Sequence, residues 1–379
     1  MCDYVVVGAG LSGSIVARHL AEKDKKVLVL EKRNHIAGNI YDFIDDNGIR
    51  IQKYGPHAFH TNLSSVWEYI SQFGEWENFC IECMVYMNER YTPSPFNFQT
   101  VDDFFSEEEA NEIKEHLRME YGKRDKVTII EMLSSSDSVV KNFADFLFEN
   151  DYSLYTAKQW GIKPNEIDVR VLKRVPVFLS YKTGYFDDRF QAIPKDGFTS
   201  VVENILKHEN ITVQLNTNAM DYLTLDDAKK FVLYNGVEVP IIWTGALDEL
   251  FSYRYGKLPY RSLRFEWESL EEDSYQMAPV VAYPQADGFT RITEYKKLPV
   301  QDVVGKTTIA IEYPISVEEN SDVEPYYPIP NEKNHNAYEK YRSEINQYHN
   351  VYLCGRLAEY KYCDMDSIIN SALQLCQQL

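Results

Sequence analysis

The feature that most constrains the fold is a glycine-rich turn that links an apolar, β-branched run to a helix-like stretch near the N-terminus. The run covers residues 4–7, and a second apolar run, residues 27–30, follows the helix and leads to an acid. In a βαβ unit the glycines permit a tight turn, let a pyrophosphate approach the backbone and let the helix pack on its strand, while the acid binds the adenosine ribose. The alternative is a glycine turn without a ligand. The agreement of all these parts predicts a dinucleotide site at Gly8, Gly10, Ser12, Gly13 and Glu31.

Composition limits the partners of the chain. With 379 residues it is long enough for two or three domains. Its formal net charge of −19 and its sequence pI near 4.9 argue against nucleic acid and against an anionic membrane as partners. An anionic small ligand would therefore need a local cluster of arginines inside a negative field.

The cysteines indicate a reducing compartment, because six of them are scattered along the chain without the pattern of a disulfide framework. Cys80 and Cys83 have CxxC spacing, but no second pair and no histidine pair lies nearby, so we predict ordinary thiols and no metal site. The first residues show no secretory signal, and no stretch approaches the roughly 20 apolar residues of a membrane span. We expect a cytoplasmic protein.

The middle of the chain changes character twice. Apolar residues at three-to-four spacing over 107–117 and 139–148 predict amphipathic helices. Short aromatic and β-branched runs near 174–195 and 260–325, broken by Pro and Gly, predict antiparallel strands.

The cofactor is predicted from the number of dinucleotide motifs. A flavoprotein reductase that also binds NAD(P)H needs two, and this chain offers one, so the simplest interpretation is a tightly held FAD. Residues 351–355 look like a strand that ends in glycine, and a helix follows from about Asp364. By analogy of fold, such flavoproteins use this unit to bring a second helix N-terminus near the flavin ring.

Together these segments predict an α/β fold, in which a Rossmann-like FAD-binding domain carries a helical insertion domain and an antiparallel sheet domain. The FAD-binding domain is expected to be discontinuous, at residues 1–75, 196–245 and 330–379. The helical substrate or lid domain is expected at 98–172. The antiparallel sheet domain is expected at 76–97, 173–195 and 246–329.

Seven segments, in order along essentially the whole chain, resemble UDP-galactopyranose mutases of the bacterial type. The most specific are the KQWG run at 158–161 and the run that ends in Asp-Met-Asp at 364–366. The seven segments lie at 35–39, 54–61, 155–161, 172–176, 290–294, 325–329 and 355–366.

The resemblance implies an unusual isomerase. Similar enzymes convert a nucleotide-bound hexopyranose into its furanose isomer without net redox change, yet they need FAD in its reduced form. For this chain we expect UDP-galactopyranose and UDP-galactofuranose, and a role in polysaccharide biosynthesis. The family chemistry implies that reduced flavin N5 attacks the anomeric carbon, expels the nucleotide diphosphate and forms a covalent flavin–sugar adduct.

Position by position, the resemblance assigns catalytic roles to Arg174 and Arg291, which clamp the diphosphate, and to His57, which lies against the flavin. Taken alone, each arginine could form a surface ion pair. The further cofactor contacts are Asn39, Ala58, Arg356, Cys363, Asp364, Met365 and Asp366. The further substrate contacts are Tyr155, Thr156, Trp160, Tyr185, Tyr327 and Tyr362.

Some of these assignments carry alternatives. A neutral His57 with a pKa near the working pH would relay protons, whereas a structural histidine would serve its Gly-Pro turn, as we expect of His60. Helix capping alone would explain Asp364. Chemistry does not separate Tyr326 from Tyr327; the register of the motif favours Tyr327.

Three places depart from the family pattern. Ala37 stands where a second glycine is usual, a mild change if its φ is ordinary. Asp151 and Tyr152 replace an aromatic pair near the nucleotide. Ala282 replaces an asparagine that contacts the substrate, so the substrate could instead be a deoxy or amino hexose on UDP or dTDP.

Two other classes of function stay open on the sequence. An FAD-dependent oxidase of the amine-oxidase type shares the N-terminal fold, but the paired Arg174 and Arg291 speak against its apolar substrate channel. A flavin-dependent sensor would have no diphosphate site. Binding of a nucleotide sugar would separate both from a mutase. The oligomeric state, a homodimer included, the flavin reductant and the polysaccharide pathway are not set by the sequence.

Overall fold

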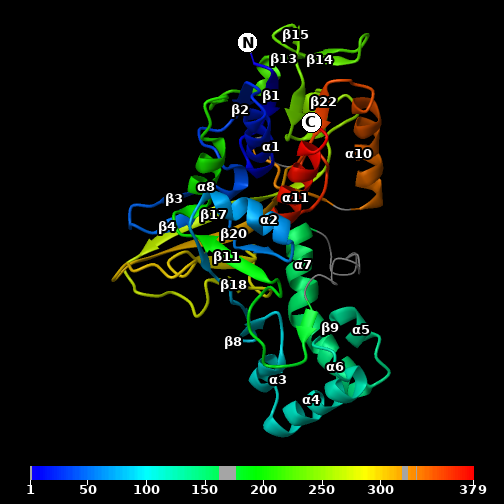
Figure 1. Cartoon of the computed structure of the whole chain (residues 1–379). Helices are drawn as coiled ribbons and strands as arrows, with labels where there is room; N and C mark the ends of the chain where they lie inside the picture. The colour runs from blue at the N-terminus through cyan, green and yellow to red at the C-terminus, as the bar shows by residue number, and fades with distance from the viewer. Residues whose placement is uncertain (1, 162–175, 318–322, 330) are drawn as a thin grey trace.

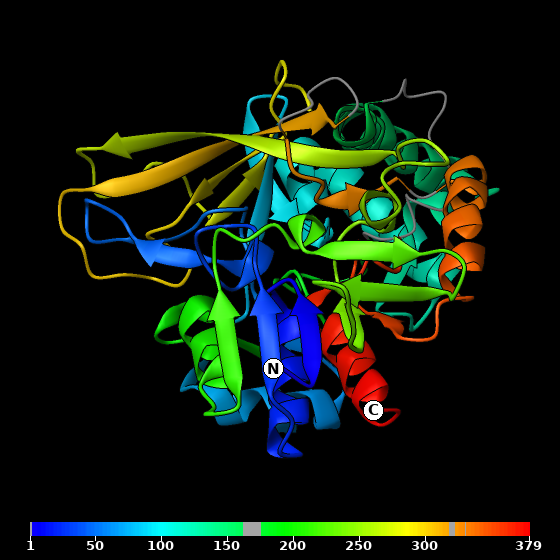
Figure 2. The same cartoon turned by 90° about the horizontal axis from the view of Figure 1, so that it is seen from above.

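The computed structural model describes residues 2–161, 176–317, 323–329 and 331–379 (Figure 1). Within these ranges, one part of the chain is a five-stranded parallel sheet with the strand order β12-β2-β1-β16-β22 (Figure 2). The strands are β1 (Tyr4–Val7), β2 (Val27–Leu30), β12 (Ile211–Gln214), β16 (Ile241–Trp243) and β22 (Val351–Leu353). The sheet therefore joins segments from both ends of the chain.

Helices cover both faces of the parallel sheet. One face packs against α1 (Leu11–Glu22), α8 (Gly197–Leu206) and α11 (Met365–Cys376). The other face packs against α9 (Leu247–Leu250) and α10 (Glu332–Ile345). Burial on both faces explains why β1 and β2 are continuous apolar runs in the sequence. These three layers agree with the predicted Rossmann-like fold.

A larger, seven-stranded sheet lies beside the parallel one (Figure 2). Its order is β21-β17-β20-β19-β18-β7-β8, and its neighbours are antiparallel except for the pair β7 and β18. It contains the antiparallel strands predicted within 260–325. Its strands are β7 (Cys83–Met87), β8 (Arg90–Ser94), β17 (Tyr260–Leu270), β18 (Val280–Ala282), β19 (Arg291–Glu294), β20 (Thr307–Ser316) and β21 (Tyr327–Pro328).

A group of helices lies at the end of the molecule opposite the parallel sheet (Figure 1). It has its own apolar core, and α4 and α6 are the two amphipathic helices that the sequence predicts. A π-helical turn, Phe148–Tyr152, joins α6 to α7. The helices are α3 (Phe98–Phe104), α4 (Glu107–Tyr121), α5 (Ile129–Leu133), α6 (Ser138–Leu147) and α7 (Ser153–Trp160).

The remaining strands form small sheets besides the two large ones. The described strands of the 174–195 region, β10 and β11, pair in two of the small sheets and not in the seven-stranded one. α9, which falls in the range expected for the sheet domain, packs on the parallel sheet. The boundaries of the three expected domains stay a prediction. The small elements are β3 (Asp42–Ile44), β4 (Arg50–Gln52), β5 (Phe59–Thr61), α2 (Ser64–Ile70), β6 (Trp76–Asn78), β9 (Lys126–Thr128), β10 (Pro176–Phe178), β11 (Phe190–Pro194), β13 (Leu223–Asp226), β14 (Phe231–Tyr234) and β15 (Val237–Glu238).

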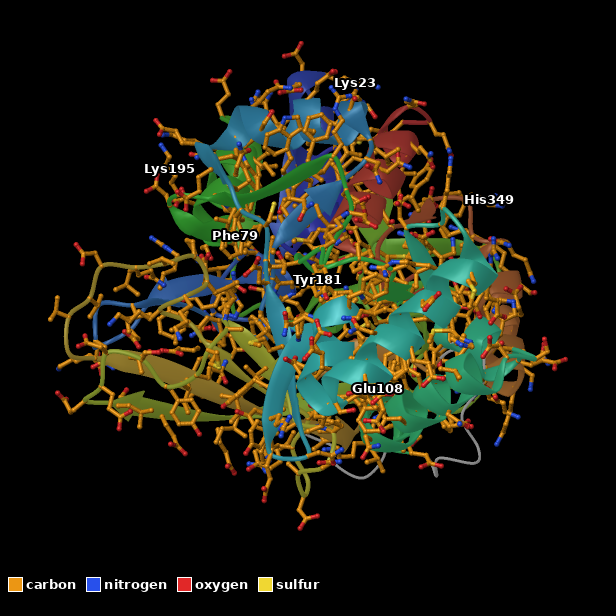
Figure 3. All side chains as sticks on the ribbon, turned by 90° about the horizontal axis from the view of Figure 1, so that it is seen from below. Lys23, Phe79, Glu108, Tyr181, Lys195 and His349 are labelled. Atoms are coloured by element: carbon orange, nitrogen blue, oxygen red, sulfur yellow. The ribbon has the colours of Figure 1, made fainter. Side chains whose placement is uncertain are left out.

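Charged side chains cover the outer surface, with Lys23 and Lys195 at the rim near the parallel sheet and Glu108 over the helical part (Figure 3). No helix in the described ranges is both long and apolar enough to cross a membrane. Among the same residues, no group of three His, Cys, Asp or Glu side chains could hold a metal ion. Cys80 and Cys83 are free thiols.

Candidate functional site

A pocket opens where the parallel strands β1 and β2 end. Its walls come from the glycine turn, from the loop at 37–40, from residues 217–219 and 243–246, and from the start of α11. Ligands of α/β folds bind at this carboxyl edge of the sheet. The pocket is therefore where the sequence predicts the dinucleotide.

Two positions of the glycine turn, Gly8 and Gly13, have no room for a side chain. Gly8 has φ +99°, and a Cβ there would lie 2.2 Å from Thr244 Oγ1. A Cβ at Gly13 would lie 2.1 Å from the Gly8 carbonyl oxygen, so helix and strand could not pack as closely. At Gly10 the nearest atom to a Cβ, the Cα of Gly38, is 3.7 Å away, and no side chain caps α1. The N-terminus of α1 is thus open to a phosphate group.

Glu31 fixes the turn to the end of β2. Its Oε2 accepts a hydrogen bond of 2.8 Å from the Ala9 N–H, and its Oε1 accepts one of 2.9 Å from the Arg33 N–H. The carboxylate is buried and lines the pocket. Each oxygen can accept a further hydrogen bond, so a ribose hydroxyl could still donate to Glu31. The contact of Glu31 with the ribose stays a prediction.

Arg33 is a pocket residue that sequence reasoning missed. Its Nη2 donates to Asn39 Oδ1 at 2.9 Å and forms an ion pair with Glu324, and its guanidinium lies 4.4 Å from the centre of the Tyr54 ring. Its Nη1 is buried and has no hydrogen-bond partner among the described residues. The only signal in the sequence was that Arg33 is a basic residue in the loop that follows Glu31. The structure thus adds a cation to the pocket lining.

Ala37 requires a correction. The substitution was expected to be mild if φ were ordinary, but Ala37 has φ 71° and ψ −1°, in the left-handed region. Its N–H donates to the Ala9 carbonyl at 2.9 Å, which holds the loop against the glycine turn. A Cβ in this conformation costs about 1–2 kcal/mol relative to glycine.

His57 is held as a neutral imidazole. Its Nδ1 lies 2.8 Å from the Gly55 carbonyl oxygen, so Nδ1–H donates and Nε2 is left as an acceptor. Burial, together with the positive charges of Arg356 and Arg291, lowers the pKa of His57 to about 4. The expectation of a pKa near the working pH was therefore wrong, while the expected contact with the Gly-Pro turn is present. Ala58, the next residue, packs beside the core around Ile51 and is not part of the pocket wall.

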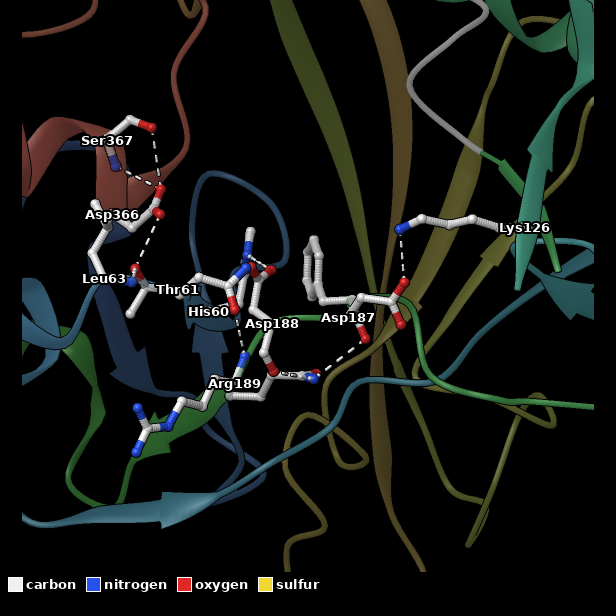
Figure 4. Close-up of polar contacts among 12 residues, drawn as sticks. His60, Thr61, Leu63, Lys126, Asp187, Asp188, Arg189, Asp366 and Ser367 are labelled. Atoms are coloured by element: carbon white, nitrogen blue, oxygen red, sulfur yellow. Dashed lines mark hydrogen bonds and ion pairs between the residues drawn. The ribbon is translucent and has the colours of Figure 1, made fainter. Parts of the chain in front are cut away.

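Figure 4 shows how the strand after His57 is fixed. His60 Nδ1 lies 2.7 Å from Asp188 Oδ2, and its ring stacks on Phe186 with centroids 3.6 Å apart. Both contacts agree with a structural role for His60. Thr61 Oγ1 donates to Asp366 Oδ2 at 3.1 Å, which ties β5 to the first turn of α11.

Arg291 is positioned by the pairing of two strands. It lies on β19 directly opposite Glu312 of β20. Its Nε and Nη2 both lie 2.8 Å from Glu312 Oε2, and Glu312 is 4 % exposed. Two charge-assisted hydrogen bonds to a buried acid leave the guanidinium little freedom. The sequence motif contained Arg291 but gave no sign of its partner.

Arg356 contacts several residues in the C-terminal part of the site. Its Nη2 donates to the Cys363 carbonyl at 2.7 Å and its Nη1 to the Tyr326 carbonyl at 3.4 Å. Its guanidinium lies 5.2 Å from the ring centre of Tyr327 and 5.5 Å from that of Tyr362. The Tyr327 and Tyr362 rings stack 5.4 Å apart.

The structure also separates Tyr326 from Tyr327. Tyr326 is buried, lines the dinucleotide pocket and packs edge-on against Tyr54 at 5.8 Å. Burial raises the pKa of the Tyr327 hydroxyl to about 12, against the opposing charges of Arg356 and Arg291. Tyr327 is therefore the one of the two that lies beside both arginines.

Tyr155, on α7, lies near Arg291. Burial raises the pKa of its hydroxyl above the usual range, and the nearby positive charge of Arg291 opposes that rise. Thr156 is buried beside it, and Tyr185 packs edge-on against Phe186 with centroids 5.0 Å apart. Tyr155, Tyr185 and Arg291 therefore share one region, although they come from a helix, a loop and a strand.

The first turn of α11 does not show the side-chain capping that the sequence suggested for Asp364. Asp364 occupies the N-cap position, yet its side chain makes no capping hydrogen bond. Met365 lines the pocket, and Asp366 accepts from Thr61 and from the Ser367 N–H at 2.6 Å. Capping alone does not account for Asp364.

Two predicted residues are not placed. Arg174 lies outside the described residues. Trp160 is the last residue of α7, and its side chain lies outside the described part as well.

Comparison with known proteins first defines the class. Residues 6–73 match a sequence model of an NAD(P)-binding Rossmann-like domain, and residues 150–362 match that of UDP-galactopyranose mutase. The second match covers more than half of the chain. The chain belongs to the UDP-galactopyranose mutase family and is an isomerase of the mutase type.

Relatives and solved structures agree with this membership. A UDP-galactopyranose mutase from Mycoplasma genitalium is 35% identical, over 100% of this chain and 94% of the relative. A dTDP-fucopyranose mutase from Escherichia coli is 33% identical, over 100% of this chain and 98% of the relative. A solved reduced UDP-galactopyranose mutase has a TM-score of 0.73 at 17% identity, covering 100% of this chain and 95% of that chain.

The fold is also shared outside the family. A putrescine oxidase variant has a TM-score of 0.58 at 12% identity, covering 100% of this chain and 98% of that chain. At such identity the likeness concerns the fold alone. It agrees with the expectation that amine-oxidase-type enzymes share the N-terminal fold of this chain.

Proposed function

We propose that the protein interconverts UDP-galactopyranose and UDP-galactofuranose with bound, reduced FAD and without net redox change. Membership of the mutase family supports a pyranose–furanose exchange on a nucleotide-bound hexose. The observation that carries the proposal is Arg291, a cation fixed by buried Glu312 and close to both His57 and Tyr155. This is the group that a departing diphosphate needs in a protein of net charge −19.

The pocket residues fit FAD. The open N-terminus of α1 and the space at Gly10 suit a pyrophosphate, and Arg33 adds a positive charge to the pocket lining. Arg356 supplies a fixed cation that would favour an anionic reduced flavin. Reduced FAD, when bound, supplies the nucleophile for the anomeric carbon of the sugar.

The chain's own residues bind and orient the substrate. Arg291 neutralises the diphosphate as its bond to the sugar breaks, together with Arg174, to which the family resemblance assigns the same role. Tyr327 and Tyr362 offer hydroxyl groups beside Arg356, and His57 offers a neutral Nε2 acceptor. The helix α7 and the aromatic side chains around it exclude water from the substrate site.

A related substrate is the second candidate. Ala282 of β18 is paired with Arg291 of β19, so both side chains point to the same face of the sheet. The methyl group of Ala282 leaves a hydroxyl of the sugar without an amide partner. This favours a mutase of the same kind on another UDP- or dTDP-hexopyranose, and the dTDP-fucopyranose mutase among the relatives supports it.

The test is a product assay on the purified holoprotein. Its flavin is reduced with dithionite under anaerobic conditions, UDP-galactopyranose is added, and products are separated by anion-exchange chromatography. We expect a furanose product with reduced flavin only. Arg291→Lys should lower kcat/KM at least about tenfold, because lysine cannot reproduce the paired hydrogen bonds of a guanidinium.

Arg264→Lys is the matched control, since Arg264 lies on the same sheet, half-exposed, in an ion pair with Glu266. It should leave kcat/KM unchanged. If no furanose forms but UDP or dTDP binds tightly, the result would favour the second candidate, a mutase that acts on another UDP- or dTDP-hexopyranose. Neither furanose nor nucleotide binding would contradict the proposed function.

A further inference from the structure

The loop between β18 and β19 connects two residues that the proposed function places beside the substrate. It covers residues 283–290, so it begins directly after Ala282 and ends directly before Arg291. Its two ends are joined, because the Tyr283 N–H donates to the Thr290 carbonyl at 2.8 Å. A movement of this loop is therefore passed on to Ala282 and Arg291.

The helix α7 is attached to this loop at its C-terminal end. Lys158 Nζ donates to three carbonyl oxygens of the loop at 2.6–2.8 Å. The same helix lies against β20, which carries Glu312, the partner of Arg291. Tyr155 and Thr156, to which the family resemblance assigns substrate contacts, also lie on α7. The helix and the loop therefore form two sides of the proposed substrate site.

A second attachment lies at the other end of α7, and three amide side chains form it. Asn150, in the π-helical turn before the helix, accepts two hydrogen bonds at its Oδ1, one of 3.1 Å from Asn88 Nδ2 and one of 3.2 Å from Gln285 Nε2. Gln285 Nε2 also donates to Asn88 Oδ1 at 2.8 Å. Asn88 comes from the turn between β7 and β8, and Gln285 from the loop between β18 and β19. We call these three residues the amide ring.

The backbone orients the amide ring. The Asn88 N–H donates to Gln285 Oε1 at 2.9 Å, and Asn150 Nδ2 donates to the Phe146 carbonyl at 2.8 Å. Asn88 has φ 46°, in the left-handed region that asparagine tolerates better than most residues. Every polar side-chain atom of the ring therefore has a hydrogen-bond partner, and the three amides act as one connected contact.

The amide ring is not what holds the helical part together. Asn88 and Gln285 are exposed, and the helices have an apolar core of their own. The ring instead fixes where α7 lies. Asn150 and Lys158 are separated by roughly 12 Å along a helix, at about 1.5 Å per residue. A helix that is held to the same loop at two points so far apart cannot turn away from it at either end.

We infer that the amide ring of Asn88, Asn150 and Gln285 positions α7 against the loop between Ala282 and Arg291, and so keeps the substrate site in its binding arrangement. This inference rests on the proposed function. Without the ring, α7 spends part of the time away from the loop, and the apparent affinity falls with the fraction of molecules in the binding arrangement. Bound substrate restores that arrangement. The ring should therefore act on KM and not on kcat.

The test measures kcat and KM for UDP-galactopyranose with the reduced holoprotein, and the Kd of UDP by calorimetry. Asn150→Ala removes the acceptor that the other two amides share, and it should raise both KM and Kd about fivefold, with kcat within about twofold of the wild type. Gln285→Ala should give the same pattern. A purely structural role would lower the fraction of folded protein, and hence the apparent kcat, without changing KM.

Two matched variants make the test specific. At pH 8 the carboxylate of Asn150→Asp still accepts from both partners, so this variant should keep the KM of the wild type. Asn235→Gly is the control for Asn88→Gly, because each removes an exposed side chain from a hairpin turn in which φ is positive, 49° at Asn235 and 46° at Asn88. Asn88→Gly should raise KM, and Asn235→Gly should leave it unchanged.

Three results would overturn the inference. In the first, KM and Kd are unchanged in Asn150→Ala and Gln285→Ala. In the second, kcat falls while KM stays constant, which would mean that the ring serves stability alone. In the third, Asn150→Asp raises KM as much as Asn150→Ala, so that the hydrogen bonds of the ring are not the cause.

Failure of the proposed function gives different results. A wild type that binds UDP but makes no furanose would contradict the proposed substrate, and the Kd values of the variants would still decide this inference. A wild type that does not bind UDP would contradict both.

Discussion

At the scale of single residues, the site depends on guanidinium groups that acids hold in place, a buried one for Arg291 and a half-buried one for Arg33. Glu312 fixes Arg291 from the neighbouring strand, and Glu324 fixes Arg33 from a segment almost 300 positions away in the sequence. In a strongly acidic chain, each pair concentrates positive charge at one point while the surroundings stay negative. Rigid cations are the arrangement that a departing diphosphate requires.

His57 gives a prediction at this scale. The folded protein resists protonation of His57 down to about pH 4, whereas an unfolded histidine takes up a proton near pH 6.5. Between these values the unfolded state binds more protons, so the free energy of unfolding falls as the pH falls, by at most about 1.4 kcal/mol per pH unit from this group. His57→Gln, which keeps a donor for the Gly55 carbonyl, should remove that contribution.

The measurement is urea denaturation of both proteins without flavin at several pH values. The carboxyl groups that titrate in the same window are common to the two proteins, so the difference isolates His57. Parallel curves for wild type and variant would show that His57 protonates normally in the folded chain.

At the scale of elements, α7 is attached to the sheet at its C-terminal end. Lys158 donates to three carbonyl oxygens of the loop between β18 and β19, and Arg261 Nε of β17 donates to the Gln159 carbonyl at 3.2 Å. Gly161 ends the helix with φ 64°, and a Cβ there would lie 2.8 Å from the Arg261 guanidinium. Two cations at a helix C-terminus also suit the helix dipole. Tyr155 is positioned through this attachment.

Lys158→Met is the variant that tests the attachment. It keeps the aliphatic stem but loses all three hydrogen bonds, so we expect KM for the nucleotide sugar to rise about tenfold with a smaller change in kcat. Hydrogen exchange at residues 283–289 should increase, because the loop loses its contact with the helix. Lys141→Met, at an exposed position of α6, is the control. An unchanged KM in Lys158→Met would show that the three hydrogen bonds do not position the substrate helix.

At the scale of the whole molecule, the dinucleotide pocket is assembled from segments that span the chain, from Val7 to Ile368. Segments that are far apart in the sequence meet beside the pocket, as the ion pair of Arg33 with Glu324 shows. A ligand that contacts all of them favours the folded state over the unfolded chain.

Removal of the flavin tests this coupling. Restoring FAD at a free concentration about 100 times its Kd should raise the free energy of unfolding of the apoprotein by about 2.7 kcal/mol. Arg33→Met should need about tenfold more FAD for the same gain, because it removes a cation from the pocket lining and loses the ion pair with Glu324. Lys25→Met, at an exposed position outside the pocket wall, is the control and should titrate like the wild type. Equal FAD affinity in all three proteins would show that Arg33 is not a cofactor contact.

The sequence by itself determined the features that depend on near neighbours along the chain. The apolar runs of β1 and β2, the glycines at 8 and 13 and the two amphipathic helices could be predicted because a strand, a turn or a helix is set by periodicity within some ten residues. The antiparallel strands within 260–325 were predicted for the same reason, whereas the partners of those near 174–195 were not.

Only the tertiary structure decided how distant residues meet. Glu312 opposite Arg291, Glu324 beside Arg33 and the carbonyl oxygens around Lys158 depend on strand register and on how the loops pack, which the local pattern does not encode. The left-handed conformation of Ala37 and the low pKa of His57 have the same origin, since backbone strain and desolvation arise from the surroundings and not from the residue.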